Sequence, residues 1–421
     1  MSVARKNRPA GRSRSTEPFS RRGQYRLAAD AARRVALGHP WVFREALGGR
    51  AITEPTGSVV ELQGGNQAFV GRGFVDQDHT IIVRVLSRDP EQRVQPGAGA
   101  IRARFLSAVK LRWLSFGPAG GPPAMRLFSG DSEGLPGVNV DRYGGFVVVH
   151  WLTAGALPWR DELYDAIEES LHPSGIYEQR RLRPLGGQAP PEPAVRARGA
   201  EAPLEVVVEE AGCRFGVDVT APLGVGFFPD LRAGRDAVAA RAADRRVLNL
   251  FSYTGAFSVR AAAAGAQEVV AVDTVAKAHA RARRNLELSG IDPTRVEAIT
   301  AEAGKTLDRF ASLNRKFDLV ICDPPTFSHA QGTGTPFSVT RDLGHLAAAC
   351  LRVLEPGGLL AFSTNATKLS PSDVERALAE GATEARVPAL IVGRVGLPPD
   401  YPVAPGFAEG NYLKFYLVSR G

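Results

Sequence analysis

The chain has 421 residues, of which 44% are hydrophobic and 23% charged, a composition typical of globular proteins with two or three domains. No run approaches the ~20 apolar residues that a membrane-spanning helix needs, which excludes an integral membrane protein. Cys213, Cys322 and Cys350 lie far apart, which excludes a disulfide scaffold and a cysteine-based zinc site. We therefore expect a cytoplasmic protein.

Much of the net charge of +8 lies in a basic arm at the start of the chain. Residues 1–22 carry seven Lys and Arg side chains against Glu17 alone. A basic arm on a nearly neutral body suits a polyanion such as a nucleic acid, whereas the plainer interpretation is a disordered, solvated tail. The arm has no apolar segment of the kind that a secretory signal contains.

Residues 23–90 predict a small β-rich domain. A helix is expected at 26–37, followed by strands at 58–62, 68–74 and 80–86, with a hairpin turn at Gly64-Gly65. Val83 and Val85 alternate with Arg84, a pattern typical of a strand with one buried face.

Residues 91–220 predict a central α/β domain. Helices are expected at 100–114 and 159–171, and strands at 138–141, 146–151, 204–209 and 213–218. The Asp- and Gly-rich run 126–137 is expected to form a loop between strands. Residues 181–203 are rich in Pro, Gly and Arg without apolar periodicity, which predicts a mobile loop.

Strands and helices alternate over residues 221–421, which predicts a parallel, doubly wound α/β sheet. The expected strands are 247–250, 268–273, 296–300, 317–322, 358–363 and 412–418. The expected helices are 256–265, 277–290 and 340–354.

The segment VLNLFSYTGAF at 247–257 runs from an apolar strand through a glycine turn into a helix. The backbone N–H groups of such a turn, together with the helix N-terminus, form a site for a carboxylate or phosphate at the carboxyl edge of the sheet. Gly255 is the only glycine of a G-x-G-x-x-G motif present, so we expect a smaller anchor than a pyrophosphate. Asn249, Phe251 and Tyr253 are candidates for the same site.

Two acids follow the next strands. Asp273 ends its strand 18 residues after Gly255, where a carboxylate accepts hydrogen bonds from a ribose diol. The plainer role of Asp273 is to cap the helix that follows. Glu302 lies just past the third strand, in a position to meet an adenine edge or to remain a solvated loop acid.

The motif Asp323-Pro324-Pro325-Thr326-Phe327 follows the strand at 317–322. Two prolines fix an extended backbone, which directs the Asp323 carboxylate and the Phe327 ring toward whatever lies beside the cofactor. A ring in this position can stack on a base, although core packing is the more common fate of a single Phe. Pro324, Pro325 and Phe327 are therefore candidate substrate-binding residues.

Together these motifs resemble class I S-adenosylmethionine-dependent methyltransferases. Further motifs resemble RlmI-type bacterial 23S ribosomal RNA methyltransferases over nearly the whole chain after the tail: HPWVF at 39–43, GDSEGLPG at 130–137, VDRYG at 140–144, VGFFPDLR at 225–232 and EGNYLKFYLV at 409–418. This resemblance implies an RNA-binding PUA domain, a central α/β domain and a Rossmann-like methyltransferase domain.

The resemblance also implies roles for individual residues. Phe227, Asp230 and Arg232 would lie near S-adenosylmethionine, whose methionine part the Gly255 turn would hold. Asp273 would bind the ribose, Glu302 the adenine (where the family usually has Asp), and Asp323 would lie at the reaction centre. The implied partner is 23S rRNA or a large-subunit precursor, with no membrane; a homodimer is compatible with the pattern. No metal-ligand motif occurs, so we expect no metal.

One position departs from the RlmI pattern. These enzymes make 5-methylcytosine by adding a cysteine thiolate to the base, and that cysteine follows Phe-Ser near the end of a strand. Here the segment is Phe362-Ser363-Thr364-Asn365, and a Thr hydroxyl without an adjacent base is a poor substitute. Phe-Ser-x-Asn occurs in RlmK-type guanine-N7 methyltransferases, whose DPPTFS motif matches 323–328.

Guanine N7 has an in-plane lone pair and no proton to remove, so its methylation needs mainly correct placement. We therefore expect transfer to guanine or to another directly nucleophilic atom, with Asp323, Thr364 and Asn365 at the reaction centre and the base turned out of its stack. The alternatives are 5-methylcytosine formation, a catalytically lapsed RNA-binding protein, and a methyltransferase for small molecules.

Overall fold

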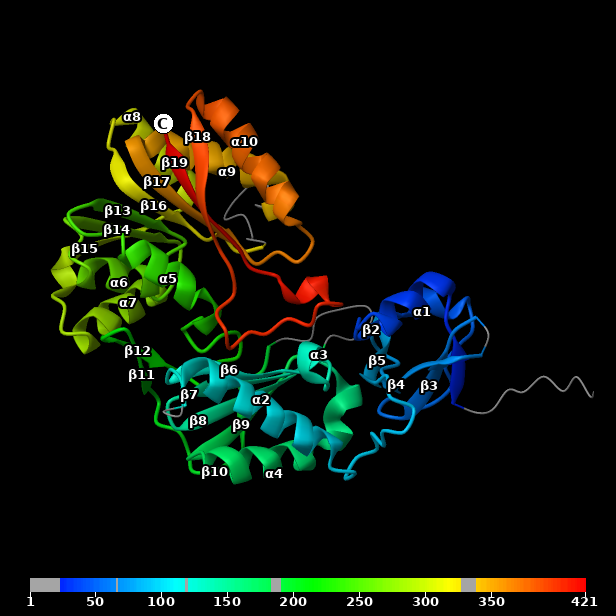
Figure 1. Ribbon diagram of the computed structural model, residues 1–421. Helices are drawn as coiled ribbons and strands as arrows, with labels where there is room; N and C mark the ends of the chain where they lie inside the picture. The colour runs from blue at the N-terminus through cyan, green and yellow to red at the C-terminus, as the bar shows by residue number, and fades with distance from the viewer. Residues whose placement is uncertain (1–22, 66, 118–119, 183–190, 327–337) are drawn as a thin grey trace, which may run out of the picture.

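The computed structural model describes residues 23–65, 67–117, 120–182, 191–326 and 338–421. Three units follow one another along the chain, and Figure 1 shows the first and the last at the two ends of an arc, with the second between them. The basic arm 1–22 and Phe327 lie outside the described residues. No helix in the described ranges is long and apolar enough to cross a membrane.

The N-terminal unit is a five-stranded sheet with the order β1-β3-β4-β5-β2, and it confirms the predicted β-rich domain. Its elements are β1 (Gln24–Arg26), α1 (Ala29–Ala36), β2 (Trp41–Phe43), η1 (Arg44–Leu47), β3 (Val59–Gln63), β4 (Phe69–Val75) and β5 (Ile81–Ser87). The expectation that β5 has one exposed face is wrong, because Arg84 is 3% exposed and its guanidinium lies 3.8 Å from the Asp131 carboxylate of the next unit.

The central unit is a five-stranded sheet with the order β10-β9-β8-β7-β6, covered on one face by α2 and α4. Its elements are α2 (Ala100–Phe116), β6 (Ala124–Ser129), α3 (Gly130–Glu133), β7 (Val138–Tyr143), β8 (Phe146–Trp151), η2 (Ala154–Trp159), α4 (Arg160–Leu171), β9 (Gly175–Arg180) and β10 (Val195–Gly199).

Two expected loops are partly regular structure. Residues 126–129 belong to β6, in which Arg126 and Leu127 face opposite sides of the sheet. The strand is not predicted, because the residues that follow it are rich in Asp and Gly. Within the expected loop 181–203, β10 pairs antiparallel with β9. This edge strand keeps most of its side chains exposed, so its sequence VRARG needs no apolar alternation.

A hairpin of β11 (Val206–Glu210) and β12 (Cys213–Val217) leads into the last unit, a seven-stranded sheet with the order β15-β14-β13-β16-β17-β19-β18. Its strands are β13 (Arg246–Leu250), β14 (Glu268–Asp273), β15 (Val296–Thr300), β16 (Phe317–Cys322), β17 (Leu354–Thr364), β18 (Ala389–Val395) and β19 (Lys414–Arg420). Its helices are η3 (Pro229–Leu231), α5 (Arg232–Ala239), α6 (Ala256–Ala263), α7 (Ala276–Leu288), η4 (Pro293–Arg295), α8 (Ala303–Ser312), α9 (Val339–Val353), α10 (Pro371–Ala385) and η5 (Ala408–Gly410).

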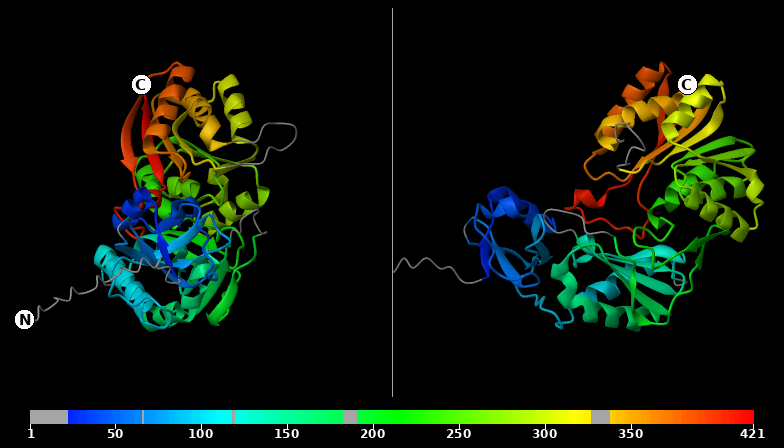
Figure 2. Two further views of the ribbon diagram at one scale, coloured as in Figure 1. Left: turned by 90° about the vertical axis from the view of Figure 1, so that its right-hand side faces the viewer. Right: turned by 180° about the vertical axis from the view of Figure 1, so that it is seen from behind.

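Helices cover both faces of this sheet, as predicted: α5, α6 and α7 pack on one side, and α8, α9 and α10 on the other. The sheet is mixed rather than wholly parallel, because β19 runs antiparallel between β17 and β18. No crossover helix joins β18 to β19. Residues 396–413 instead leave the sheet and run across the other two units (Figures 1 and 2).

This connection, 396–413, contacts both preceding units. The fully buried Asp400 accepts hydrogen bonds from the backbone N of Arg126 on β6 (3.0 Å) and from Nη1 of Arg232 (2.8 Å). The Phe407 ring packs edge-on against Trp41 of β2, with 4.7 Å between ring centroids. The connection therefore holds the three units together at one junction.

Candidate active site at the carboxyl edge of the last sheet

The parallel strands β13, β14, β15, β16 and β17 end at one edge of the sheet. The segments that follow them carry most of the predicted site residues, and ligands bind at this edge in open α/β sheets. The site therefore consists of a glycine turn after β13, acids after β14 and β15, and a second group of polar residues after β16 and β17.

The turn after β13 has an unusual backbone. Phe251, Tyr253 and Gly255 all have left-handed φ values, of 55°, 48° and 77°. A Cβ at Gly255 would also lie 2.7 Å from the Cβ of Ala282 on α7, so close packing requires glycine there. Strained non-glycine residues of this kind cluster at ligand sites.

Side chains from neighbouring segments hold this turn in place. The Asp273 carboxylate accepts hydrogen bonds from the backbone N of Tyr253 (2.8 Å) and of Val275 (2.9 Å). Nδ2 of the buried Asn285 donates to the Thr254 carbonyl at 2.8 Å. Asp273 remains partly exposed, so it supports the turn and still presents a carboxylate at the surface.

The turn fits a polar ligand. Ser252 is 6% exposed, and its Oγ has no hydrogen-bond partner in the described part of the chain. A buried hydroxyl left unpaired is costly, so an orphaned donor beside a glycine turn suits a site that a bound molecule completes. The Tyr253 ring and the half-exposed Phe228 ring lie 5.5 Å apart and give the turn an apolar wall.

Two cofactor candidates lie at the margins of this turn. Asn249 is buried, and its Nδ2 donates to Ser258 Oγ at 2.9 Å, which places it beneath the turn. Glu302 is partly exposed at the start of α8 and pairs with Lys305 at 2.8 Å. Glu302 is therefore accessible, as an adenine contact would require.

Asp323 follows β16 and accepts a hydrogen bond from Ser363 Oγ on β17. Desolvation by burial is the main cause that raises the pKa of Asp323 to about 6. The hydrogen bond from Ser363 and the charge of Arg235 lower the pKa, while the nearby carboxylate of Asp230 raises it further. Asp323 is thus an acid that titrates near neutral pH.

Asp230 lies in η3 and accepts a hydrogen bond of 2.8 Å from the Tyr412 hydroxyl. Burial raises the pKa of Asp230, and the Tyr412 hydrogen bond opposes that shift. Because the charge of Asp230 raises the pKa of Asp323, the two acids lie in one region. Sequence reasoning missed Tyr412 as a site residue, although it lies within the motif EGNYLKFYLV.

The same reasoning missed Lys414. Its ammonium group donates to the carbonyl oxygens of Ala366 and Tyr412, at 2.9 Å each, and burial lowers its pKa. Lys414 thereby joins the segment that follows β17 to the residue that holds Asp230.

Phe227 and Arg232 support the site through ring packing and hydrogen bonds. Phe227 is 3% exposed and packs on Phe215, with 4.8 Å between ring centroids. Arg232 donates to the Ala124 carbonyl at 2.7 Å and to the Asp400 carboxylate. Arg232 therefore ties the central unit to η3.

The remaining candidates lie beside Asp323. Thr364 is fully buried, and its Oγ1 accepts a hydrogen bond of 3.2 Å from the backbone N of Ala366. Asn365 is exposed and accepts a hydrogen bond of 3.3 Å from Thr326 Oγ1. Pro324 is buried and Pro325 is exposed.

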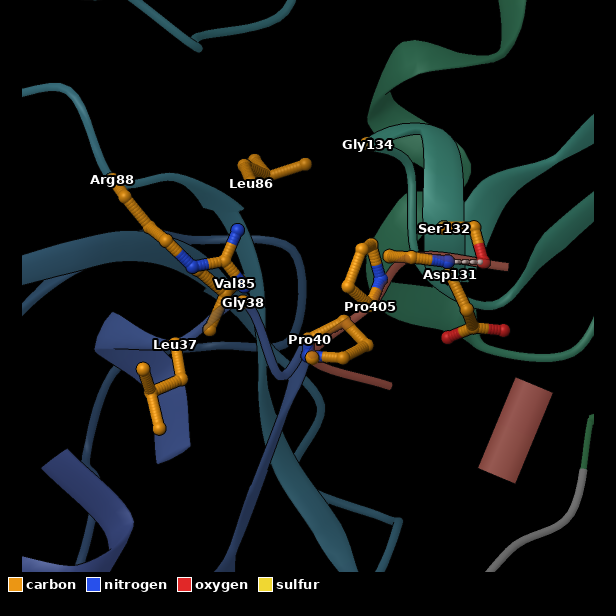
Figure 3. A pocket seen from close by; sticks show the side chains of 12 residues that line it. Leu37, Gly38, Pro40, Val85, Leu86, Arg88, Asp131, Ser132, Gly134 and Pro405 are labelled. Atoms are coloured by element: carbon orange, nitrogen blue, oxygen red, sulfur yellow. Dashed lines mark hydrogen bonds between the residues drawn. The ribbon is translucent and has the colours of Figure 1, made fainter. Parts of the chain in front are cut away.

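A pocket of about 240 Å³ lies elsewhere, where the first two units meet the connection 396–413 (Figure 3). Arg88, Asp131 and Pro405 are among its lining residues, and none of the predicted site residues borders it. In the described ranges, no group of three or more His, Cys, Asp and Glu side chains is placed to hold a metal ion.

Comparisons with known proteins agree with this geometry. The sequence model of the S-adenosylmethionine-dependent methyltransferases matches residues 175–415, and that of the PUA-like domain matches residues 26–88. The ribosomal RNA large subunit methyltransferase I of Shewanella denitrificans is 30% identical over 94% of this chain and 98% of its own length. The ribosomal RNA large subunit methyltransferase I of Cronobacter sakazakii is 29% identical over 92% of this chain and 97% of its own length.

Solved structures share the fold. A chain described as a methyltransferase and complexed with SAH superposes with a TM-score of 0.84, at 24% identity, over 94% of this chain and 99% of its own. A Streptococcus mutans protein described as an S-adenosylmethionine-dependent methyltransferase gives a TM-score of 0.81 at 25% identity over the same shares. The chain therefore belongs to the S-adenosylmethionine-dependent methyltransferase family, and within it to the ribosomal RNA large subunit methyltransferase I type with an N-terminal PUA-like domain.

Proposed function

We propose that this methyltransferase modifies a base of large-subunit ribosomal RNA, and that the accepting atom is a nucleophilic ring atom of a purine, such as guanine N7. Relatives named for large-subunit rRNA match the chain over nearly its whole length. The PUA-like domain and the basic arm 1–22 supply the RNA-binding surface in this proposal. We divide the chain into a PUA domain at 23–90, a central domain at 91–220 and a methyltransferase domain at 221–421.

The choice of base depends on one observation: the reaction centre lacks an accessible thiol. Methylation of cytosine carbon 5 needs a thiolate that adds to the ring. All three cysteines of the sequence are described, and each is buried. Cys322 is adjacent to Asp323, but burial raises the pKa of its thiol well above the ordinary range. A base that carries its own lone pair needs no such nucleophile.

In the proposed site, S-adenosylmethionine supplies an electrophilic methyl group when bound. The backbone N–H groups of the Gly255 turn bind its carboxylate, and the Asp273 carboxylate accepts hydrogen bonds from its ribose. Asp323 and Asn365 orient the base, and Pro324 and Pro325 hold the backbone of Asp323 extended. Placement of this kind accounts for most of the rate enhancement in a direct transfer.

Asp273→Ala is expected to weaken S-adenosylmethionine binding by about 10- to 100-fold, because a charged acceptor for two hydroxyl groups is lost. Isothermal titration calorimetry measures this change. Asp292→Ala removes an exposed acid at the opposite edge of the sheet, whose carboxylate accepts a hydrogen bond from the backbone N of Thr294, and it should leave the affinity unchanged. A folded Asp273→Ala protein with wild-type affinity would remove the ribose assignment.

Thr364→Val is expected to retain methyl transfer to within about tenfold, because the Thr364 hydroxyl is buried and accepts a hydrogen bond from a backbone N–H. Transfer of a labelled methyl group to rRNA measures this. Loss of all transfer in a variant that still binds cofactor would mean that the hydroxyl takes part in the chemistry.

Nucleoside mass spectrometry of 23S rRNA, from strains with and without the gene, tests the proposal as a whole. A methylated purine that disappears with the gene supports direct transfer. Loss of 5-methylcytidine would contradict the choice of base, and an unchanged set of nucleosides would contradict large-subunit rRNA as the substrate. A catalytically lapsed RNA-binding protein is disfavoured, because the turn, Asp273 and Asp323 are all retained.

A further inference from the structure

A chain of polar side chains crosses the central sheet on the face opposite α2 and α4. It runs from Gln179 on β9 through His150 on β8 and Asp141 on β7 to Arg126 on β6. His150 Nδ1 lies 3.0 Å from Gln179 Oε1, and its Nε2 lies 3.2 Å from Asp141 Oδ2. Asp141 accepts two hydrogen bonds from Arg126, at 2.7 Å from Nε and 3.0 Å from Nη2.

This chain fixes the orientation of the Arg126 guanidinium. Gln179, His150 and Asp141 are each less than 9% exposed, and buried polar groups paired in a network adopt one arrangement. The pairing of Arg126 with Asp141 is bidentate, which sets the plane of the guanidinium as well as its position. Asp141 comes from the motif VDRYG, to which the proposed function gives no other role.

Arg126 lies near Asp230, one of the acids of the candidate site. Strand β6 packs directly against η3, which carries Asp230, and the backbone N of Arg126 donates to Asp400. The guanidinium carbon lies 4.7 Å from the centre of the Tyr401 ring. The positive charge of Arg126 also lowers the pKa of Asp230, which burial raises.

One edge of this guanidinium is unused. Nε and Nη2 are occupied by Asp141, whereas Nη1 donates to no residue in the described ranges, and the side chain is 16% exposed. Arg126 remains charged at any physiological pH. Asp141 uses two of the five N–H groups of the guanidinium, so the central unit still offers the edge formed by Nη1 and the second N–H of Nη2, at a site where Asp230 and Asp323 of the last unit offer acceptors.

We infer that Arg126 is a base-binding residue whose Nη1 donates to the carbonyl oxygen of the target base, while the carboxylates of Asp230 and Asp323 accept from its ring and amino N–H groups. The inference deepens the proposed function and rests on it. Guanine presents this set of groups: O6 accepts, and N1–H and N2–H₂ donate. A phosphate in the same place would meet two carboxylates.

Methyl transfer to guanine N7 requires the lone pair of N7 to remain uncovered. Arginine commonly donates to O6 and N7 of guanine together, which would cover the lone pair of N7. The proposed contact therefore runs from Nη1 to O6 alone, which leaves N7 open to the methyl group.

The test uses the full chain and large-subunit rRNA from a strain that lacks the gene. Arg126→Gln should lower kcat/KM for the RNA by about 10- to 100-fold, as for loss of one specific base contact, with S-adenosylmethionine affinity unchanged by calorimetry. Arg246→Gln is the matched control, because Arg246 also pairs with carboxylates, those of Asp318 and Glu355, but at the opposite edge of the sheet. That variant should keep the wild-type kcat/KM.

A second measurement separates base binding from a structural role. RNA that carries 6-thioguanosine at the modified position keeps N1–H and N2–H₂ but presents sulfur, a weak acceptor, in place of O6. The wild type should lose activity on this RNA, and Arg126→Gln should lose no more than it already has. Equal further losses in both proteins, or wild-type kcat/KM in Arg126→Gln, would overturn the inference. An inactive wild type would overturn the proposed function, and the inference with it.

Discussion

Asp323→Asn is expected to reduce methyl transfer by about 10²- to 10⁴-fold and to raise the melting temperature near neutral pH. The first effect follows because a charged acceptor that orients the base is lost. The second follows because burial disfavours the ionised carboxylate, while the amide of Asn is neutral and can still accept the hydrogen bond from Ser363. Activity and stability should therefore change in opposite directions.

The pH dependence of both quantities follows from the pKa of Asp323, which is raised to about 6. The ionised form predominates above that pH, so kcat/KM of the wild type should rise through about pH 6. The protonated acid is the form that the fold favours, so its contribution to stability is complete below the ordinary aspartate pKa and is lost as the pH rises through about 6. Differential scanning fluorimetry at pH 5 and pH 7.5 should show a larger gain for Asp323→Asn at pH 7.5.

Asp318→Asn is the matched control, because Asp318 lies near the other end of the same strand, β16. Its pKa is lowered, chiefly by hydrogen bonds from Arg246, so its ionised form stabilises the fold. This variant should lose stability at pH 7.5 and keep its activity. A wild-type transfer rate in Asp323→Asn would mean that Asp323 has no part in placing the base.

Glu210→Ala is expected to destabilise the protein by about 3–5 kcal/mol, the usual result of leaving a buried charge unpaired. Glu210 is 7% exposed and accepts hydrogen bonds from Arg235 at 2.6 Å and 2.7 Å. Arg232 and Arg260 also lie within 4.0 Å of its carboxylate. Removal of one acid therefore leaves three arginines close together without their shared partner.

Glu210→Ala should also disturb the candidate active site, because Arg235 contacts residues that precede η3. Arg235 is 1% exposed, donates to the Phe228 carbonyl at 2.8 Å, and lies 4.4 Å from the centre of the Phe227 ring. Guanidinium chloride unfolding measures the loss of stability. Glu209→Ala is the control, because Glu209 is exposed and lies 3.9 Å from an equally exposed Arg214, so it should change stability by less than about 1 kcal/mol. Equal denaturation midpoints for Glu210→Ala and Glu209→Ala would contradict a stabilising role of Glu210.

The sequence predicts most of the last sheet, because its buried strands are short apolar runs that end in Gly, Asp or Pro. The bounds 268–273, 296–300 and 317–322 are confirmed. Strands β1 and β2 have three residues each, which is too few for an alternation of apolar and polar side chains to be recognised. Strand β10 is missed because its pairing depends on backbone hydrogen bonds rather than on apolar side chains.

The glycine turn and the Asp-Pro-Pro motif could be recognised because each is continuous in sequence. Tyr412, Lys414 and Arg126 could not, since each forms a hydrogen bond with a residue between 48 and 274 positions away. The departure of Thr364 from the family pattern is visible in the sequence. Its complete burial is not, because burial depends on how β19 packs against β17.

The inner position of β19 determines the order in which this enzyme can assemble. The strand follows β13 to β18 in sequence, yet it lies between β17 and β18, so the sheet is complete only when the end of the chain has paired with both of them. Pairings of this long range form late. Because Tyr412 and Lys414 arrive with β19, a folding intermediate can have a complete cofactor turn and most of its helices while it still lacks a reaction centre.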